Sequence, residues 1–160
     1  MTSRVMLALC LIASTSAQAK QEMSVADEKL LSSYTLSMDK LHRYEGALKK
    51  LDAACKTDAS LRDETQNAEP KPGATLGEAI QQVGSSGVYK RYLKPAGLEA
   101  QDVVLMPITL MGAGAVVEAH ADPAKLKGLS DAQVSFYRTH RDEIQKLKLT
   151  GGCEGDEAGE

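Results

Sequence analysis

An almost unbroken apolar run at 103–117 constrains the fold more than any other feature, because only Pro107 and Thr109 interrupt its fifteen residues. A helix that is apolar on all sides has to be surrounded by protein, so we predict that this run forms the central helix of the domain. Pro107 removes one backbone hydrogen bond and predicts a kink, unless it falls in the first turn. The alternative interpretation is a buried strand over Val103–Leu110.

The small and flexible side chains of this run predict how it packs. Gly112 and Gly114 lower the helix propensity, but they permit a neighbouring helix to approach closely. Met106 and Met111 are five residues apart and do not line up as a copper-binding pair. We therefore expect both methionines to fill gaps in the core.

An amphipathic helix is expected over the segment that ends at Cys55. Its apolar residues recur three and four positions apart, which is the spacing of one helical face, and Thr35 or Ser37 can cap its start. The residues of this face are Leu36, Met38, Leu41, Tyr44, Leu48, Leu51, Ala54 and Cys55.

Two capping boxes predict where further helices begin. In Thr75–Glu78 (TLGE) the Thr and Glu side chains can satisfy free backbone donors reciprocally, and a short helix should follow through about Val83. The sequence Ser130–Gln133 (SDAQ) has the same pattern and predicts a helix through about Leu147.

Proline and glycine mark breaks between these elements. Val88–Leu93 should form a short helix that stops before Pro95, with Gly97 closing the turn. The stretch 56–74 is rich in Asp, Glu, Asn, Pro and Gly and contains the clear break EPKPG at 69–73. This composition predicts a mobile loop near 56–74.

The segment 1–19 has the three parts of a secretory signal peptide. Met1–Arg4 carries one positive charge, Val5–Ala13 is apolar but too short to span a bilayer, and Ala17–Ala19 suits a signal peptidase. We expect cleavage near Ala19 and export to a bacterial periplasm, with secretion from a eukaryotic cell as the alternative. A lipoprotein site at Cys10 is disfavoured because a leucine precedes it.

Export would leave two cysteines, Cys55 and Cys153, and an even pair in an oxidising compartment predicts a disulfide. The bond would join the end of an early helix to the C-terminal tail. Because it closes a long loop, chain-entropy arguments put its stabilisation at roughly 4–5 kcal/mol. A reactive catalytic thiol is the alternative, but no electropositive or histidine-containing local setting supports it.

These patterns together predict an all-α protein, a single-domain helical bundle of about four to six helices. The helical domain is expected over 35–150, after a polar leader with some helical content at 20–34 and before an acidic tail at 151–160. A chain of this length suits one domain with a single core.

Charge and composition narrow the classes of partner. Removing 1–19 takes away Arg4, so the formal net charge changes from −3 to −4. This balance argues against nucleic acid, whose binding needs clustered Lys and Arg. The low aromatic content, with no Trp, weakens a sugar-binding interpretation. We expect no later segment to be long and apolar enough for stable membrane insertion, which leaves a protein partner or self-association.

Three residues near predicted helix ends are candidate metal ligands: His120, Asp122 and His140. They would converge on Zn²⁺ if the last two helices formed an antiparallel hairpin, and three ligands plus a water suit such a site. Haem held non-covalently by His and Met is a second alternative. The simpler interpretation places His120 at a helix C-terminus, His140 beside a carboxylate and His42 on an exposed helical face.

No catalytic signature is present, which favours an exported, non-catalytic protein without a cofactor that works by binding or association. The first alternative is a periplasmic zinc- or haem-binding protein that uses His120 and His140. The second is a hydrolase with an unrecognised site, which a deep pocket holding a perturbed Asp, Glu or His would support.

Three segments of the chain resemble small, uncharacterised, all-helical periplasmic proteins of bacteria. These segments are Thr35–Tyr44, the Ala96-Gly97-Leu98 turn before the apolar run, and Ser130–Ile144 with Phe136 and His140 four residues apart. The likeness covers about residues 30–148. Because its motifs are helix-packing patterns, the resemblance implies a fold and a location but no activity.

Overall fold

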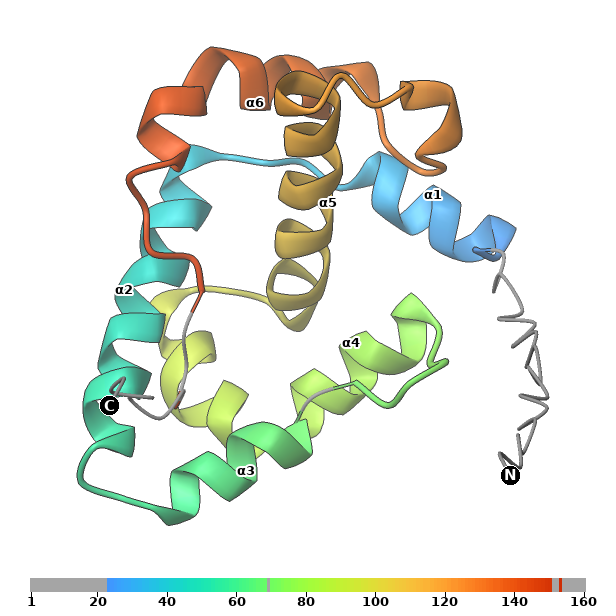
Figure 1. Cartoon of the computed structure of the whole chain (residues 1–160). Coiled ribbons are helices and arrows are strands. Elements are labelled where there is room, and N and C mark those ends of the chain that lie inside the picture. Colours follow the sequence, from blue (N-terminus) through green and yellow to red (C-terminus); the bar gives the residue numbers. More distant parts are fainter. Residues whose placement is uncertain (1–22, 69, 151–152, 154–160) are drawn as a thin grey trace, which may run out of the picture.

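The computed structural model describes residues 23–68, 70–150 and 153, and within these ranges it contains six α-helices and no strand (Figure 1). The predicted all-α, single-domain bundle is therefore confirmed. The predicted signal peptide at 1–19 and most of the predicted tail at 151–160 lie outside the described residues. The α-helices are α1 (Val25–Ser33), α2 (Met38–Cys55), α3 (Ser60–Ala68), α4 (Leu76–Ser85), α5 (Ala100–Glu118) and α6 (Asp131–Ile144). Three short helices of other types join them: the π-helix η1 (Tyr89–Leu93) and the 3-10 helices η2 (Lys94–Ala96) and η3 (Pro123–Lys125).

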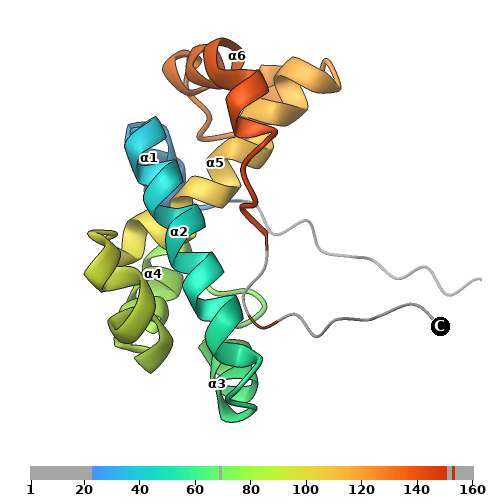
Figure 2. The same cartoon turned by 90° about the vertical axis from the view of Figure 1, so that its left-hand side faces the viewer.

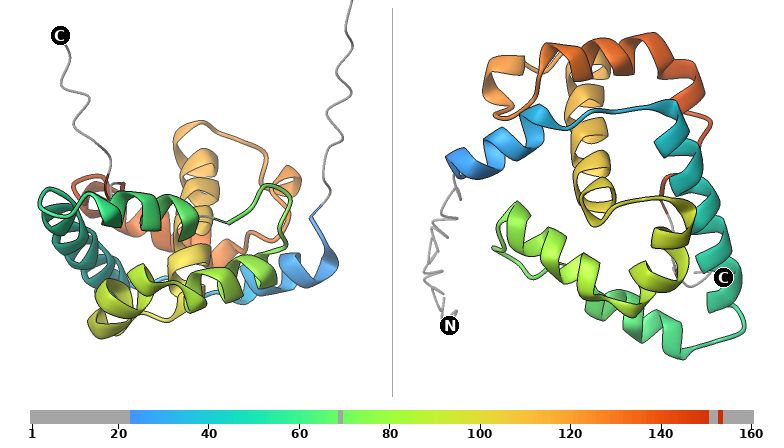
Figure 3. Two further views of the ribbon diagram at one scale, coloured as in Figure 1. Left: turned by 90° about the horizontal axis from the view of Figure 1, so that it is seen from below. Right: turned by 180° about the vertical axis from the view of Figure 1, so that it is seen from behind.

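Helix α5 runs through the middle of the fold, and the other helices are arranged around it (Figures 1 and 3). Helices α1 and α2 lie on opposite sides of α5, and α6 crosses its C-terminal end. Helices α3 and α6 lie near opposite ends of the long helix α2 (Figure 2). The predicted central position of the apolar run is confirmed.

The capping residues begin the helices where the sequence predicts. Ser37, and not Thr35, caps α2 by accepting a hydrogen bond from the Lys40 backbone N–H. Reciprocal capping boxes are present at the starts of α4 and α6, as expected for Thr75–Glu78 and Ser130–Gln133.

Helix α5 is one continuous helix through Pro107, so the strand alternative is wrong. Gly97 turns the chain ahead of it with a φ of +75°, a conformation that glycine adopts without strain. At the start of α5 the Asp102 carboxylate accepts a hydrogen bond from the Glu99 backbone N–H at 2.9 Å. This contact satisfies one of the free donors of the first turn.

Residues flanking the apolar run join α5 and extend it to 19 residues. Its mean hydropathy reaches 1.6 over an 18-residue window, so by length and composition it is long enough and apolar enough to cross a membrane. By length and composition alone, this differs from the expectation for the chain after residue 19, and the expected absence of stable membrane insertion stays a prediction. A core helix passes the same test, and 39% of the window is buried within the protein.

The two glycines of α5 pack differently. A Cβ on Gly114 would lie 3.2 Å from the Tyr137 ring of α6, so this glycine allows the close helix contact that the sequence predicts. A Cβ on Gly112 would make ordinary contact with Leu129, at 3.5 Å. The expected close approach of a helix is therefore confirmed at Gly114 and wrong at Gly112.

This difference in packing predicts that alanine affects the stability of the protein differently at the two positions. Gly112→Ala should raise the free energy of unfolding by up to about 1 kcal/mol, because alanine has the higher helix propensity and space is available. Gly114→Ala should gain less or be destabilising, because its methyl group would press on Tyr137. Urea unfolding of both variants measures the difference, and equal gains would contradict the assigned packing.

Within the predicted polar leader at 20–34, the described residues 23–34 contribute more to the fold than a polar leader would. Leu31 and Tyr34 at the end of α1 are buried in the core. The buried Gln133 side chain of α6 donates hydrogen bonds to the backbone carbonyls of Leu31 at 2.7 Å and Tyr34 at 2.8 Å. These contacts place α1 within the helical domain that the sequence predicts to begin at residue 35.

The loop predicted for 56–74 contains the helix α3. Asp58 begins it by accepting hydrogen bonds from the backbone N–H and the hydroxyl of Ser60. Leu61 is the buried residue of this otherwise polar helix. One apolar anchor gives no periodicity, which is why the sequence pattern does not reveal a helix here.

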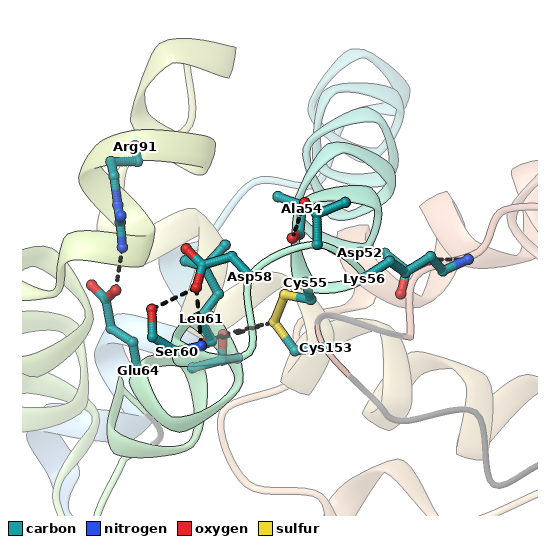
Figure 4. Close-up of a disulfide and its surroundings, with 12 residues drawn as sticks. Asp52, Ala54, Cys55, Lys56, Asp58, Ser60, Leu61, Glu64, Arg91 and Cys153 are labelled. Carbon is teal, nitrogen blue, oxygen red and sulfur yellow. Dashed lines mark hydrogen bonds and ion pairs between the residues drawn. A yellow bond between two sulfur atoms is a disulfide. The ribbon is translucent and has the colours of Figure 1, made fainter.

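Cys55 and Cys153 form the predicted disulfide, with their Cα atoms 5.2 Å apart (Figure 4). The described residues that follow α6 run back beside α2 (Figures 1 and 2), where the Lys148 backbone N–H donates a hydrogen bond to the Glu45 carboxylate. The bridge belongs to a second apolar cluster beside the main core. This cluster contains Leu51, Cys55, Leu61, Val88 and Cys153.

Candidate functional site

One side of α5 is not covered by other helices. Met111 is 73% exposed and Pro107 is also exposed, while Ile108, Gly112 and Ala115 are half-buried. The expectation that protein surrounds this helix on all sides is therefore wrong, and so is the core position predicted for Met111. Because the run is apolar all round, its sequence carries no sign of the face that stays open.

A groove of about 610 Å³ lies along this open side of α5. It is lined by side chains from α5, from the start of the described chain and α1, and from the stretch 125–129, which covers the end of η3 and the residues after it. Its apolar lining consists of Met23, Leu31, Ile108, Met111, Gly112, Ala115, Leu126 and Leu129. The volume falls within the roughly 300–1,000 Å³ that is typical of small-molecule sites.

A second apolar cavity of about 370 Å³ adjoins the same helix. Ile108 lines both cavities, so the apolar surface continues from Pro107 in the second cavity to Met111 in the groove. The second cavity lies among α2, α3, α4, η1 and α5. Its apolar lining includes Leu48, Leu51, Val83, Val88, Leu93, Val103 and Val104.

The segment after η3 is held in place by close backbone packing against α1. Gly128 has a φ of +79°, and a Cβ there would lie 3.2 Å from the Glu28 backbone. Asp122 caps η3 by accepting a hydrogen bond from the Ala124 backbone N–H at 3.0 Å. The Leu129 N–H donates to the Leu126 carbonyl at 3.2 Å. This side of the groove is therefore formed before any ligand arrives, which lowers the ordering cost of binding.

Within the described ranges, Lys125 and Lys127 are the only charged side chains that line the groove. The Lys127 ammonium lies 3.6 Å from the Glu28 carboxylate. The exposed Lys125 ammonium has no hydrogen bond or ion pair within the part of the chain that the structure describes. The charged part of the groove is therefore basic.

Neither cavity supplies the groups of a hydrolytic site. Among the described residues, no Asp, Glu, His or Cys lines the groove or the second cavity. The polar side chains of the second cavity are hydroxyls, from Tyr44, Thr65, Ser86 and Tyr89. General acid–base catalysis near neutral pH usually relies on imidazole or carboxyl groups, so these cavities suit binding better than hydrolysis.

Two of the three candidate metal ligands, His120 and Asp122, lie in the connection between α5 and η3, and the third, His140, lies on α6. His120 is exposed just beyond the end of α5, and Asp122 caps η3. His140 lies on α6, with its ring centroid 4.7 Å from that of Phe136 and its Nδ1 4.0 Å from Glu143. Helix α6 crosses the end of α5, instead of forming the antiparallel hairpin that the zinc hypothesis requires (Figure 1).

The predicted position of His42 on an exposed helical face is confirmed. The Nε2 of His42 lies 3.3 Å from Glu143, the carboxylate that His140 also approaches. No group of three or more His, Cys, Asp or Glu side chains arranged for a metal ion occurs in the ranges described. The zinc and haem alternatives stay predictions.

A buried polar cluster joins Tyr34, Lys40 and Asp102. Asp102 is 1% exposed and accepts hydrogen bonds from the Tyr34 hydroxyl at 3.0 Å and the Lys40 ammonium at 2.7 Å. Burial would raise the pKa of the Asp102 carboxyl, but these bonds and the bond from Glu99 outweigh it and lower the pKa. Burial and the Asp102 charge raise the pKa of Tyr34.

This cluster has residue types that occur in acid–base sites, but its arrangement indicates a role in holding the helices together. None of its three side chains lines the groove or the second cavity. The Asp102 carboxylate is occupied by donors from the α1–α2 connection, α2 and the start of α5. The cluster fixes the N-terminal end of α5 against the first two helices.

Comparisons of the chain with protein-family models, curated proteins and solved structures found no match. The groove could not be predicted from a sequence motif, since Ile108, Met111 and Gly112 belong to a run in which every face is apolar. The one local sequence feature of the groove is the pair of lysines on either side of Leu126, ahead of a glycine.

Proposed function

We propose that the protein is an exported, non-catalytic helical protein that binds an apolar ligand in the groove along α5. The observation that carries this proposal is the exposure of Met111 in the middle of the most apolar helix. A single exposed apolar residue is ordinary, but Met111 is continuous with the apolar lining of a large groove.

The chemistry of the lining supports binding of an apolar group. Transfer of apolar surface out of water contributes about 25 cal/mol for each Å² that ligand and groove bury. Met111 is unbranched and adaptable, so it can close over ligands of different shape. Because the segment 125–129 is already ordered, binding costs less conformational entropy.

The disulfide supports the exported location within this proposal. Disulfides persist in oxidising compartments such as the periplasm and are rare in the cytosol. The signal-peptide pattern at 1–19 and the resemblance to small periplasmic helical proteins point the same way.

An uncharged fluorescent dye tests the binding site. N-phenyl-1-naphthylamine should bind residues 20–160 saturably, with a rise in fluorescence, because the groove offers an apolar lining. Met111→Gln should weaken dye binding several-fold, since it places a polar amide in the lining. Because Met111 is 73% exposed, this substitution should leave the fold intact.

Val25→Gln is the matched control. Val25 is 83% exposed, as apolar as Met111, and does not line the groove. The control variant should bind the dye like the wild type. Absence of saturable binding, or equal binding by the two variants, would contradict the proposed function.

A further inference from the structure

We infer that the ligand is a single-chain amphiphile with an anionic head group, whose alkyl chain lies in the groove and whose head lies at Lys125 and Lys127. This inference rests on the proposed function and adds the chemical class of the ligand. Its evidence is the separation of apolar and basic side chains within one groove.

The apolar part of the groove suits an alkyl chain. On its α5 side, the bulky Ile108 and Met111 are each followed four positions later by a small residue, Gly112 and Ala115. The small residues let a flexible chain approach the helix backbone closely. Among the residues that the structure describes, no Ser, Thr, Asn, Gln, Tyr or acidic side chain lines the groove, so a sugar or a nucleotide would lose most of its hydrogen bonds to water without replacement.

The basic part of the groove comes from two nearby positions of one short stretch of chain. Lys125 is the last residue of η3, and Lys127 follows it two positions later, after Leu126. Lys125 makes no ion pair in the part of the chain described, and Lys127 has only the 3.6 Å contact with Glu28. An anionic head group would complement this charge.

The formal net charge of the chain is negative, so the overall charge does not explain binding of an anion and the two lysines have to account for it. The whole protein carries −3, so general attraction does not draw anions to its surface. Recognition of an anion here therefore depends on the two lysines. Because both are exposed, we expect a modest preference of about tenfold over an uncharged head, which weakens as salt is added.

Isothermal titration calorimetry with three ligands of equal chain length tests the inference. Dodecanoate, dodecyl maltoside and dodecyltrimethylammonium would each be titrated into residues 20–160 below their critical micelle concentrations. Dodecanoate should have a dissociation constant about tenfold lower than dodecyl maltoside. Dodecyltrimethylammonium should bind most weakly.

Variants assign the preference to the two lysines. In Lys125→Gln/Lys127→Gln, dodecanoate should bind only as tightly as dodecyl maltoside, and binding of dodecyl maltoside should not change. Lys50→Gln/Lys146→Gln is the matched control, because both lysines are exposed and neither lines the groove. The control should keep the full preference for dodecanoate, and circular dichroism verifies that all variants are folded.

The outcomes separate the two proposals. Equal affinity for the three ligands would overturn the anionic class and leave the proposed function standing. A preference for dodecanoate that survives Lys125→Gln/Lys127→Gln would overturn the placement of the head group. Failure of every dodecyl ligand, together with failure of the uncharged dye, would overturn both proposals.

Discussion

Replacing Cys55 and Cys153 together with alanine should lower the free energy of unfolding by about 4 kcal/mol, the largest effect that we expect from the loss of any feature of this chain. The bond joins residues that are 98 positions apart, so its removal releases a long loop in the unfolded state. Total stabilities of small domains are about 5–15 kcal/mol, so such a loss leaves the protein close to unfolding.

The loss should be concentrated around α3. Leu61 is the one buried residue of that helix, and it packs in the cluster that contains both cysteines. The Thr65 hydroxyl donates to the Leu61 carbonyl at 2.7 Å and lies 3.1 Å from Cys153 Sγ. Without the bridge, amide hydrogen exchange should accelerate in α3 before it does in α5.

Urea unfolding of residues 20–160 measures the total effect, and reduced wild type should match the double variant. A thiol titration of the unreduced, denatured protein provides the direct check, because a complete bridge leaves no free thiol. Two titratable thiols, or an unchanged unfolding midpoint after reduction, would contradict the assigned role of the disulfide.

The sequence correctly predicts features that depend on neighbouring residues or on the number of residues of one type. Each capping box is complete within four residues, so Thr75–Glu78 and Ser130–Gln133 mark helix starts without knowledge of the fold. The disulfide follows from an even number of cysteines after export, because two cysteines allow only one pairing.

The features that the sequence does not reveal depend on distant contacts. Tyr34 and Lys40 are 68 and 62 residues away from Asp102, and no local pattern links them. The groove along α5 exists because no helix covers Met111, and a run that is apolar on every face cannot indicate which face stays open. Helix α3 depends on the single anchor Leu61.

Asp102→Ala should have the second-largest effect, a loss of about 2–4 kcal/mol in the free energy of unfolding. It would leave the Tyr34 hydroxyl and the Glu99 N–H without their acceptor at the start of α5. The Lys40 side chain is 33% exposed and can turn partly to water, which keeps the loss below that of a fully buried pair.

Asp39→Asn is the matched control for Asp102→Ala. Asp39 also pairs with a basic residue, Arg43, but both side chains are largely exposed. Its replacement should change the stability by less than about 0.5 kcal/mol. Urea unfolding at neutral pH measures both variants, and similar small losses would show that the buried cluster is not a stabilising feature.

The same cluster predicts a specific acid sensitivity. The pKa of Asp102 is lowered in the folded protein, whereas an unfolded Asp has a pKa of about 3.9. The folded state therefore binds this proton less readily, so its contribution to stability is fully present above the unfolded pKa and is lost as the pH falls through the folded pKa. Between about pH 5 and pH 2, the wild type should lose more stability than Asp102→Asn, which has no carboxyl group to protonate at this position. Parallel losses in the two proteins would show that Asp102 is not held ionised by Tyr34, Lys40 and Glu99.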